Sequence, residues 1–176
     1  MPISFYLKQA VGLLGTGLFL ISFQVKSNRK LFRIQCIAYI CYTVHFLLLG
    51  ALTGGISYIL NMTRSFCLGS KNEFLNSKKM CAIICILQFL TVFLTWDGWF
   101  AILPAAANIA ATIGCYSHNS RRIRSAAMFV NSPLWIVYDA IVGSWAGILD
   151  EVITEVSIII SLIRYGWKDL DKVDDN

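Results

Sequence analysis

Seven apolar segments follow one another along this chain, separated by short connections. Each is close to the roughly 20 residues that a helix needs to cross a bilayer. Hydrophobic residues make up 57% of the 176 residues and charged residues only 14%, against about 45–50% and about 25% in soluble domains. The sequence therefore predicts an all-α integral membrane protein with seven transmembrane helices. These are expected at residues 5–25, 31–50, 52–69, 79–96, 98–117, 123–143 and 145–166.

The basic residues alternate between the two sides of these segments. They gather in the first, third and fifth connections and after the seventh segment, whereas the even-numbered connections contain none. Because Lys and Arg mark the cytoplasmic side of a membrane protein, we expect the N-terminus outside and the C-terminus in the cytoplasm. The net charge of +5 thus belongs to orienting loops and not to a nucleic-acid-binding face. The clusters comprise Lys26, Arg29, Lys30, Arg33, Lys71, Lys78, Lys79, Arg121, Arg122, Arg124, Arg164, Lys168 and Lys172.

A pattern of the third segment recurs in the seventh. The Gly-x3-Gly pair at residues 50–54 returns at residues 143–147, an offset of 93, and polar side chains follow both copies at helical spacing. Residues 29–31 likewise match residues 121–123, so segments one to three correspond to segments five to seven. Two parallel copies need an extra crossing between them, which predicts a 3+1+3 arrangement. The expected domains are residues 1–70 (first three-helix repeat), 71–97 (linker helix), 98–167 (second repeat) and 168–176 (cytoplasmic tail).

The polar side chains after these glycines are the first candidates for a functional site. Asn61 and Arg64 lie in the third segment, and Glu151 and Glu155 in the seventh. A charge at the centre of a membrane helix costs roughly 2.5–3.5 kcal/mol, so these groups must face protein or water. One interpretation is an Arg64–Glu155 ion pair that locks the repeats together; the other is a substrate or proton site at their interface. The polar side chains that follow the glycines include three acids, Asp150, Glu151 and Glu155, but one arginine, so a single ion pair would leave two of the acids without a cationic partner.

Four further residues are second choices as substrate contacts: Tyr42, His45, Asn108 and Trp135. Each has a structural alternative. His45 can be a hydrogen-bonded packing residue, and Trp135 can belong to the core. Asn108 follows Pro104 at helical spacing and can satisfy a backbone carbonyl that the proline leaves free.

The motifs of common enzymes do not occur. The sequence has no Ser-His-Asp order, HExxH motif, P-loop or GxGxxG motif, so we expect neither an enzyme nor a bound cofactor. The six cysteines lie in or beside apolar segments without a CxxC pair, as buried, inert thiols do. Cys81 and Cys85 share a helix face, but two thiols alone make a poor metal site, and no metal is expected. The first segment lacks a basic n-region and a cleavage site, so we also expect no cleaved signal peptide.

The 3+1+3 order is similar to that of the SWEET/MtN3 and PQ-loop group of small membrane transporters. More closely, the run VHFLLLGALTGGISYILNMTR at residues 44–64 resembles the bacterial YgjV-type inner-membrane protein family. The resemblance implies a SWEET-like fold, the bacterial cytoplasmic (inner) membrane as location, and sugar as the default substrate of the wider group. Asn61 falls near that group's substrate-contacting asparagine. Pro104 and Pro133 keep the group's helix prolines in the second repeat, whereas the first repeat has none in its segments.

These patterns lead us to expect a SWEET-like transporter or facilitator that moves a small polar solute through a cavity between the two repeats. The surplus of acids suits a cation or a proton-coupled solute as well as a sugar. The alternative is a non-transporting structural, assembly or sensor protein of the inner membrane, whose intramembrane charges form a structural ion-pair network. The expected partners are the lipid bilayer and the solute; association into a homo-oligomer stays open.

Overall fold

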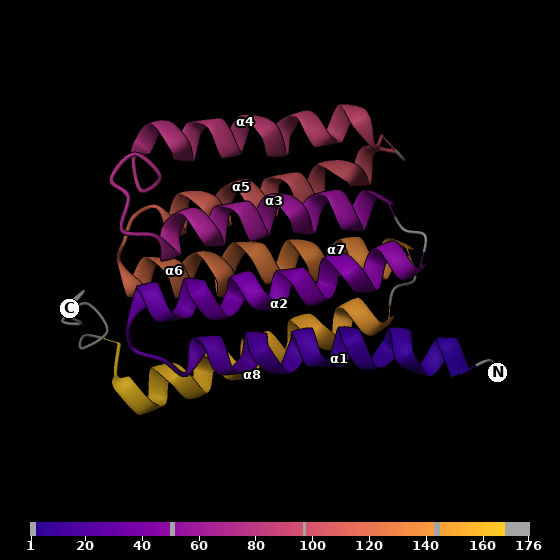
Figure 1. Cartoon of the computed structure of the whole chain (residues 1–176), viewed down its shortest axis with the longest axis horizontal. Coiled ribbons are helices and arrows are strands. Elements are labelled where there is room, and N and C mark those ends of the chain that lie inside the picture. The colour runs from indigo at the N-terminus through magenta and orange to yellow at the C-terminus, as the bar shows by residue number, and fades with distance from the viewer. Residues whose placement is uncertain (1–2, 50–51, 97, 143–144, 168–176) are drawn as a thin grey trace.

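The computed structural model describes residues 3–49, 52–96, 98–142 and 145–167, and this part of the chain is folded almost entirely into helices (Figure 1). It forms seven helical rods, of which the sixth consists of α6, a π-helical turn and α7 in succession. The all-α prediction is thus confirmed over the described residues. The helices are α1 (Ile3–Phe23), α2 (Asn28–Leu49), α3 (Leu52–Gly69), α4 (Lys78–Leu94), α5 (Ile102–Cys115), α6 (Ser120–Ala126), α7 (Ser132–Val142) and α8 (Trp145–Tyr165), with a 3-10 turn at Trp99–Ala101 and the π turn at Ala127–Asn131.

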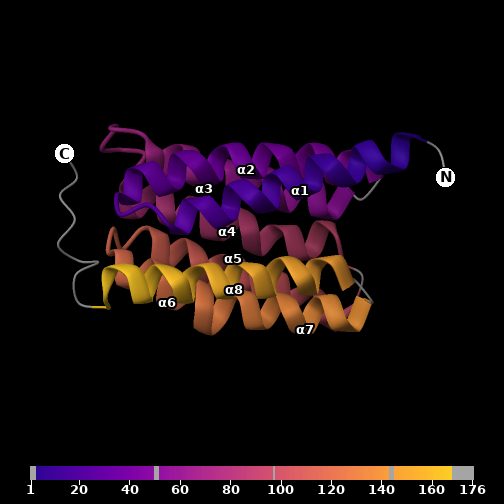
Figure 2. The same ribbon diagram turned by 90° about the horizontal axis from the view of Figure 1, so that it is seen from below.

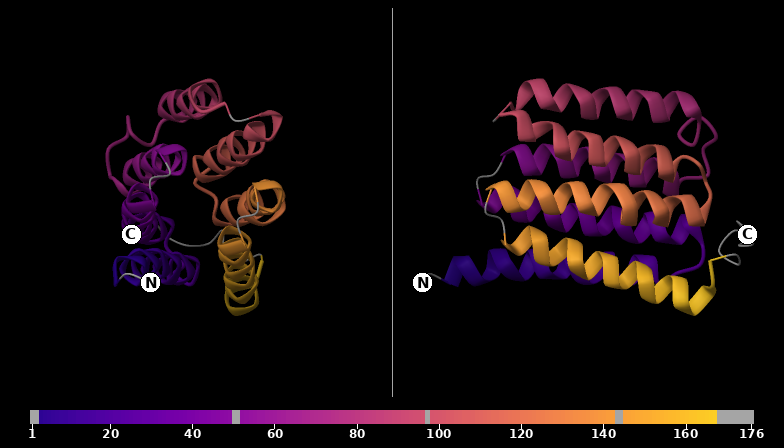
Figure 3. Two further views of the ribbon diagram at one scale, coloured as in Figure 1. Left: turned by 90° about the vertical axis from the view of Figure 1, so that its right-hand side faces the viewer. Right: turned by 180° about the vertical axis from the view of Figure 1, so that it is seen from behind.

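The rods pack in the order of the chain and close into a ring (Figure 3). In one half α2 packs between α1 and α3, and in the other half α7 packs between α5 and α8. Figure 2 shows the two halves as two layers, the first purple and the second orange to yellow. Helix α4 joins the halves along one edge, where it packs on α3 and α5, and α8 packs on α1 along the opposite edge. The interior of this ring positions the candidate site.

The connections that carry the basic clusters all lie at one end of the ring, where α8 also ends, and α1 begins at the opposite end (Figure 1). Two of these connections end in side-chain caps of the following helix. The Ser77 hydroxyl accepts a hydrogen bond from the N–H of Met80 at 3.3 Å, and Oδ1 of Asn119 accepts one from the N–H of Arg122 at 2.9 Å. Ser and Asn are favoured at this position because they satisfy N–H groups that the first helical turn leaves free.

The sixth rod changes its geometry in the middle. The π turn at Ala127–Asn131 directly precedes Ser132 and Pro133, the first two residues of α7. A proline has no N–H and its ring clashes with the carbonyl one turn earlier, so a regular α-helical turn is disfavoured here. Instead the N–H of Ser132 bonds to the carbonyl of Ala127, which gives the wider π turn. Ala127 and Asn131, at the two ends of the turn, both line the central cavity.

Apolar side chains cover the outside of the ring, whereas polar side chains lie inside it. Leu13, Phe93 and Ile163 are 69%, 66% and 79% exposed. Monomeric soluble proteins rarely expose contiguous apolar surface of this extent. By contrast, the polar side chains buried in the interior include Asn61, Arg64, Gln88, Asn108, Thr112 and Arg124.

The apolar core occupies the end of the ring at which the basic connections lie. It contains residues from the last turns of α1, α3 and α5 and from the first turns of α2 and α6, together with Ile84 of α4 and Ile158 of α8. This packing holds the helices together at that end and closes the interior toward it. The core residues are Phe23, Leu31, Phe32, Leu68, Ile84, Cys115, Tyr116, Ile123 and Ile158.

The rods lie where the apolar segments were expected, with shifts of a few residues at their ends. Over the described residues, however, none of the helices combines the length and the hydropathy that a membrane span requires. Helices α4, α5 and α7 have 17, 14 and 11 residues, and the longer α2 and α8 carry charged side chains. The prediction of seven helical segments is thus confirmed over the described residues. Of the repeated glycine pattern, Gly50 and Gly143 lie outside the described residues, as does the tail at 168–176.

Candidate functional site

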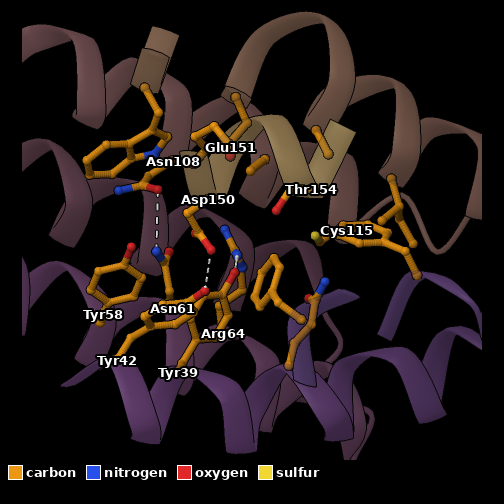
Figure 4. A pocket seen from close by; sticks show the side chains of 18 residues that line it. Tyr39, Tyr42, Tyr58, Asn61, Arg64, Asn108, Cys115, Asp150, Glu151 and Thr154 are labelled. Carbon is orange, nitrogen blue, oxygen red and sulfur yellow. Dashed lines mark hydrogen bonds between the residues drawn. The ribbon is translucent and has the colours of Figure 1, made fainter. Parts of the chain in front are cut away.

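A cavity of about 60 Å³ lies between the two halves of the ring (Figure 4). Since one water molecule needs roughly 10–15 Å³ of such space, the cavity has room for a few waters or for a small solute. Side chains from α1, α2 and α3 line it on one side, and side chains from α5, α6, the π turn, α7 and α8 on the other. Its polar lining residues are Gln35, Tyr39, Tyr42, Tyr58, Asn61, Arg64, Asn108, Asn131, Trp135, Asp150, Glu151 and Thr154.

Arg64 of α3 supplies a buried cation to this cavity. Its side chain is only 3% exposed. Nη2 donates a hydrogen bond to the Tyr39 hydroxyl at 3.0 Å, and Nη1 donates one to Oγ1 of Thr112 at 3.3 Å. Both of these partners are neutral, and the buried Nε has no hydrogen-bond partner among the described residues. A guanidinium has five N–H groups, so Arg64 has further N–H donors beyond those used in these two bonds.

A chain of amides and a hydroxyl continues from Arg64 through α3, α4 and α5. Nε2 of Gln88 donates to Oδ1 of Asn61 at 3.3 Å, and Nδ2 of Asn61 donates to Oδ1 of Asn108 at 3.4 Å. The Thr112 hydroxyl lies 3.1 Å from Oε1 of Gln88 and 2.7 Å from the carbonyl of Asn108, either of which can accept its proton. Because all four side chains are buried, these bonds replace those that water would otherwise make.

The acidic side of the cavity comes from α8. Oδ1 of Asp150 accepts a hydrogen bond from the Tyr42 hydroxyl at 2.7 Å (Figure 4). It accepts a second one from the Thr16 hydroxyl, also at 2.7 Å. The ring of Tyr42 stacks on that of Tyr58, with 5.0 Å between the centroids and 21° between the planes. Glu151, the next residue of α8, lines the same cavity. The cavity therefore combines a guanidinium from the first half with carboxyl groups from the second.

The Arg64–Glu155 ion pair, one interpretation of the sequence, is not formed. Arg64 donates to Tyr39 and Thr112 instead, and Oε1 of Glu155 is buried without a hydrogen-bond partner in the described part of the chain. Glu155 does not line the cavity that Arg64 faces, so its carboxylate and the guanidinium do not meet there.

The structure brings six of the eight predicted site residues together. They line the cavity from five helices, and their role as substrate contacts stays a prediction. Glu155 and His45 do not line it. His45 instead packs against α1 at Gly12, where an added Cβ would lie 3.1 Å from its Nδ1. The six that share the cavity are Tyr42, Asn61, Arg64, Asn108, Trp135 and Glu151.

Sequence reasoning missed three residues with direct roles in this site. Gln88 is the only amide of its apolar segment and is 2% exposed, a signal that could have marked it as buried and hydrogen-bonded. Tyr39 stands one turn before Tyr42 on α2, a spacing that places both rings on one helix face. Asp150 belonged to the recognised acidic stripe, but its neighbour Glu151 was preferred.

A second buried arginine joins the two halves beside the apolar core. Arg124 is 0% exposed although it belongs to a basic cluster that was expected in a loop. Nη2 donates to the carbonyls of Phe23 and Val25 at 3.0 and 3.2 Å, and Nε donates to the Ser161 hydroxyl at 3.0 Å. It thereby satisfies carbonyls that the end of α1 leaves free. Nearby, Gln24 donates to the carbonyl of Ser157 at 2.8 Å, a further bond between α8 and the end of α1.

Comparison with known proteins now adds to this geometry. The model of the Imp-YgjV family, described as bacterial inner membrane protein, matches residues 6–168. The chain belongs to this family. The match confirms the YgjV-type resemblance of residues 44–64 and the predicted location in the bacterial inner membrane. Neither a curated protein nor a solved structure matches the chain.

Proposed function

We propose that this Imp-YgjV protein is a SWEET-like membrane transporter or facilitator that moves a small polar solute through the cavity between its halves. The observation that carries the proposal is Arg64, a buried cation that faces this cavity with neutral hydrogen-bond partners. Burying a charge without a counter-ion is costly. A solute with a negative charge would supply this counter-ion. Before the solute binds, water in the cavity can hydrogen-bond to the guanidinium.

The polarity of the ring supports this proposal. Its outside is apolar and its interior is polar, and the polar groups converge on a cavity lined from both halves. Passage of a polar solute through a membrane protein requires such an interior, because hydrocarbon offers the solute no hydrogen bonds. The 3+1+3 interpretation adds that α1–α3 and α5–α8 are two copies of one unit, with α4 as the linker and the site between the copies.

The two ends of the ring differ in a way that suits alternating access. Toward the basic connections, the apolar core and the bonds of Arg124 to the carbonyls of Phe23 and Val25 close the interior. Opening this end would separate α1 from α6 and α8. The π turn before Pro133 provides a position at which the sixth rod can bend, since π turns and prolines both interrupt the regular helical bonding.

A second candidate is a structural or assembly protein of the inner membrane. The bonds among Gln88, Asn61, Asn108 and Thr112 favour it, because they satisfy one another without a ligand. On this reading the buried polar groups hold α3, α4 and α5 in register. The Arg64–Glu155 pair on which the sequence-based form of this alternative relied is not formed, so it would rest on these neutral groups.

Reconstitution tests the proposal. Purified protein in liposomes would be assayed for uptake of a labelled panel that includes glucose, glycine, acetate and methylamine. We expect uptake of at least one solute above that of protein-free liposomes, and its loss in Arg64→Gln. Arg122→Gln is the matched control, because Arg122 is an exposed arginine near the basic end and its loss should leave uptake unchanged. Absence of uptake for the whole panel would favour the structural candidate.

A further inference from the structure

The cavity places charges of opposite sign on walls that come from different halves. Arg64 reaches it from α3 and Asp150 from α8 (Figure 4). Each makes its hydrogen bonds to neutral groups: Arg64 to Tyr39 and Thr112, and Asp150 to Thr16 and Tyr42. In a low-dielectric interior both charges are stabilised most strongly by a counter-ion that makes direct hydrogen bonds.

The surroundings of Arg64 suit a carboxylate. Its Nε is buried without a hydrogen-bond partner among the described residues, and the planar guanidinium matches the geometry of a carboxylate. The side-chain amides of Asn61 and Asn108 line the cavity as well and supply further N–H donors. The arrangement thus offers several donors to one small anionic group.

The surroundings of Asp150 suit an ammonium group. One carboxylate oxygen, Oδ1, already accepts the hydroxyls of Thr16 and Tyr42, and a carboxylate has about four acceptor sites. The stacked rings of Tyr42 and Tyr58 lie beside it, and aromatic faces attract cations. Glu151 adds a second acid to the same lining.

We propose that the cavity binds a small zwitterion, a solute such as glycine or β-alanine with its carboxylate at Arg64 and its ammonium group at Asp150. This inference rests on the proposed function, because it assigns the substrate class of the same cavity. A sugar would bring no charge to Arg64 or Asp150, and a simple anion or amine would bring a charge to only one of them. The space for a few water molecules also selects a small solute.

Equilibrium binding tests the substrate class independently of transport. Purified protein in detergent would be titrated calorimetrically with glycine, β-alanine, acetate and methylamine. A hydrogen bond to a charged group contributes enough that we expect a zwitterion to bind roughly tenfold or more tightly than either singly charged analogue. In Asp150→Asn the preference for glycine over acetate should disappear. In Arg64→Gln the preference for glycine over methylamine should disappear, and Glu73→Gln, at an exposed acid, should change neither.

The outcomes separate the two proposals. Equal binding of glycine and acetate by the unaltered protein, or binding of glucose alone, would overturn the zwitterion assignment. Uptake of glucose without zwitterion binding would overturn it while leaving transport intact. Zwitterion binding without uptake by liposomes would support the site and refute transport. If Arg64→Gln does not fold, the zwitterion assignment is still tested by comparing the affinities for glycine, acetate and methylamine in the unaltered protein and in Asp150→Asn.

Discussion

The guanidinium of Arg64 lies 5.9 Å from the centre of the Tyr39 ring and donates a 3.0 Å hydrogen bond to the hydroxyl of the same residue. The arginine is thereby held by Tyr39 in the first half of the ring and by Thr112 in the second half. The two halves therefore meet at the cavity without a direct bond from Arg64 to Asp150 or Glu155. A solute can occupy the space between them without first breaking a bond of Arg64 to either of these two acids.

Tyr39→Phe should destabilise the protein because it removes the hydroxyl that accepts from Arg64. Hydrogen bonds to charged groups contribute about 1.5–3 kcal/mol, and we expect a loss of unfolding free energy in this range. Thermal unfolding in detergent measures it. The control is the same substitution in an Arg64→Gln background, where the extra loss should vanish. An equal loss in both backgrounds would show that the hydroxyl acts through another contact.

Gln88→Leu should destabilise the amide chain while it keeps the packing volume of α4. The substitution leaves Oδ1 of Asn61 without the donor that it has at 3.3 Å and Thr112 without one of its acceptors. A buried polar group without a partner costs about 1–3 kcal/mol. Phe89→Leu, at the next, exposed position of α4, is the control and should cost little. The prediction fails if the two variants unfold at the same temperature.

Arg124→Leu should loosen the end of the ring beside the apolar core. It leaves the carbonyl of Phe23 in a buried position and that of Val25 in a partly buried position without this donor, and a buried polar group without a partner costs about 1–3 kcal/mol. Arg122→Leu is a matched control two residues away, since Arg122 is exposed and surface changes usually stay within about 0.5 kcal/mol. Unfolding midpoints of the two variants give the comparison. Similar midpoints would mean that Arg124 does not tie α1 to α6.

Gly114→Ala should be destabilising because α5 and α6 approach each other closely there. An added Cβ would lie 2.5 Å from the Cβ of Ala126 and 3.3 Å from the carbonyl oxygen of Arg122. Overpacking of this kind costs about 1–3 kcal/mol. Gly17→Ala is the opposite case, because nothing lies within 4 Å of the added methyl, and it should be neutral or stabilise α1 by up to about 1 kcal/mol. Thermal unfolding of both variants tests the pair, and a stabilised Gly114→Ala would contradict it.

The sequence predicted the helical rods well because their signal is local. An apolar segment is bounded by basic or turn-forming residues, as α4 and α6 are at their first ends by Ser77 and Asn119, and these residues can be recognised without knowing what packs beside the segment. The candidate residues Asn61, Arg64 and Glu151 were found in the same way, since polar side chains in apolar helices must face an interior. Their convergence on one cavity follows from that requirement.

The partners of these residues could not be read from the chain. Whether Arg64 meets Glu155 or Tyr39 depends on the rotation of α3 and α8 about their axes, and one residue on a helix changes direction by about 100°. Arg124 is a further case, because a residue in a basic cluster is equally consistent with an exposed position. The sequence alone determined the all-α class of the fold, the order of the helices along the chain and the polar character of the interior. All three depend on local patterns of hydrophobicity. Only the tertiary structure decided which polar groups meet, because each hydrogen bond depends on how two separately formed helices are turned toward one another.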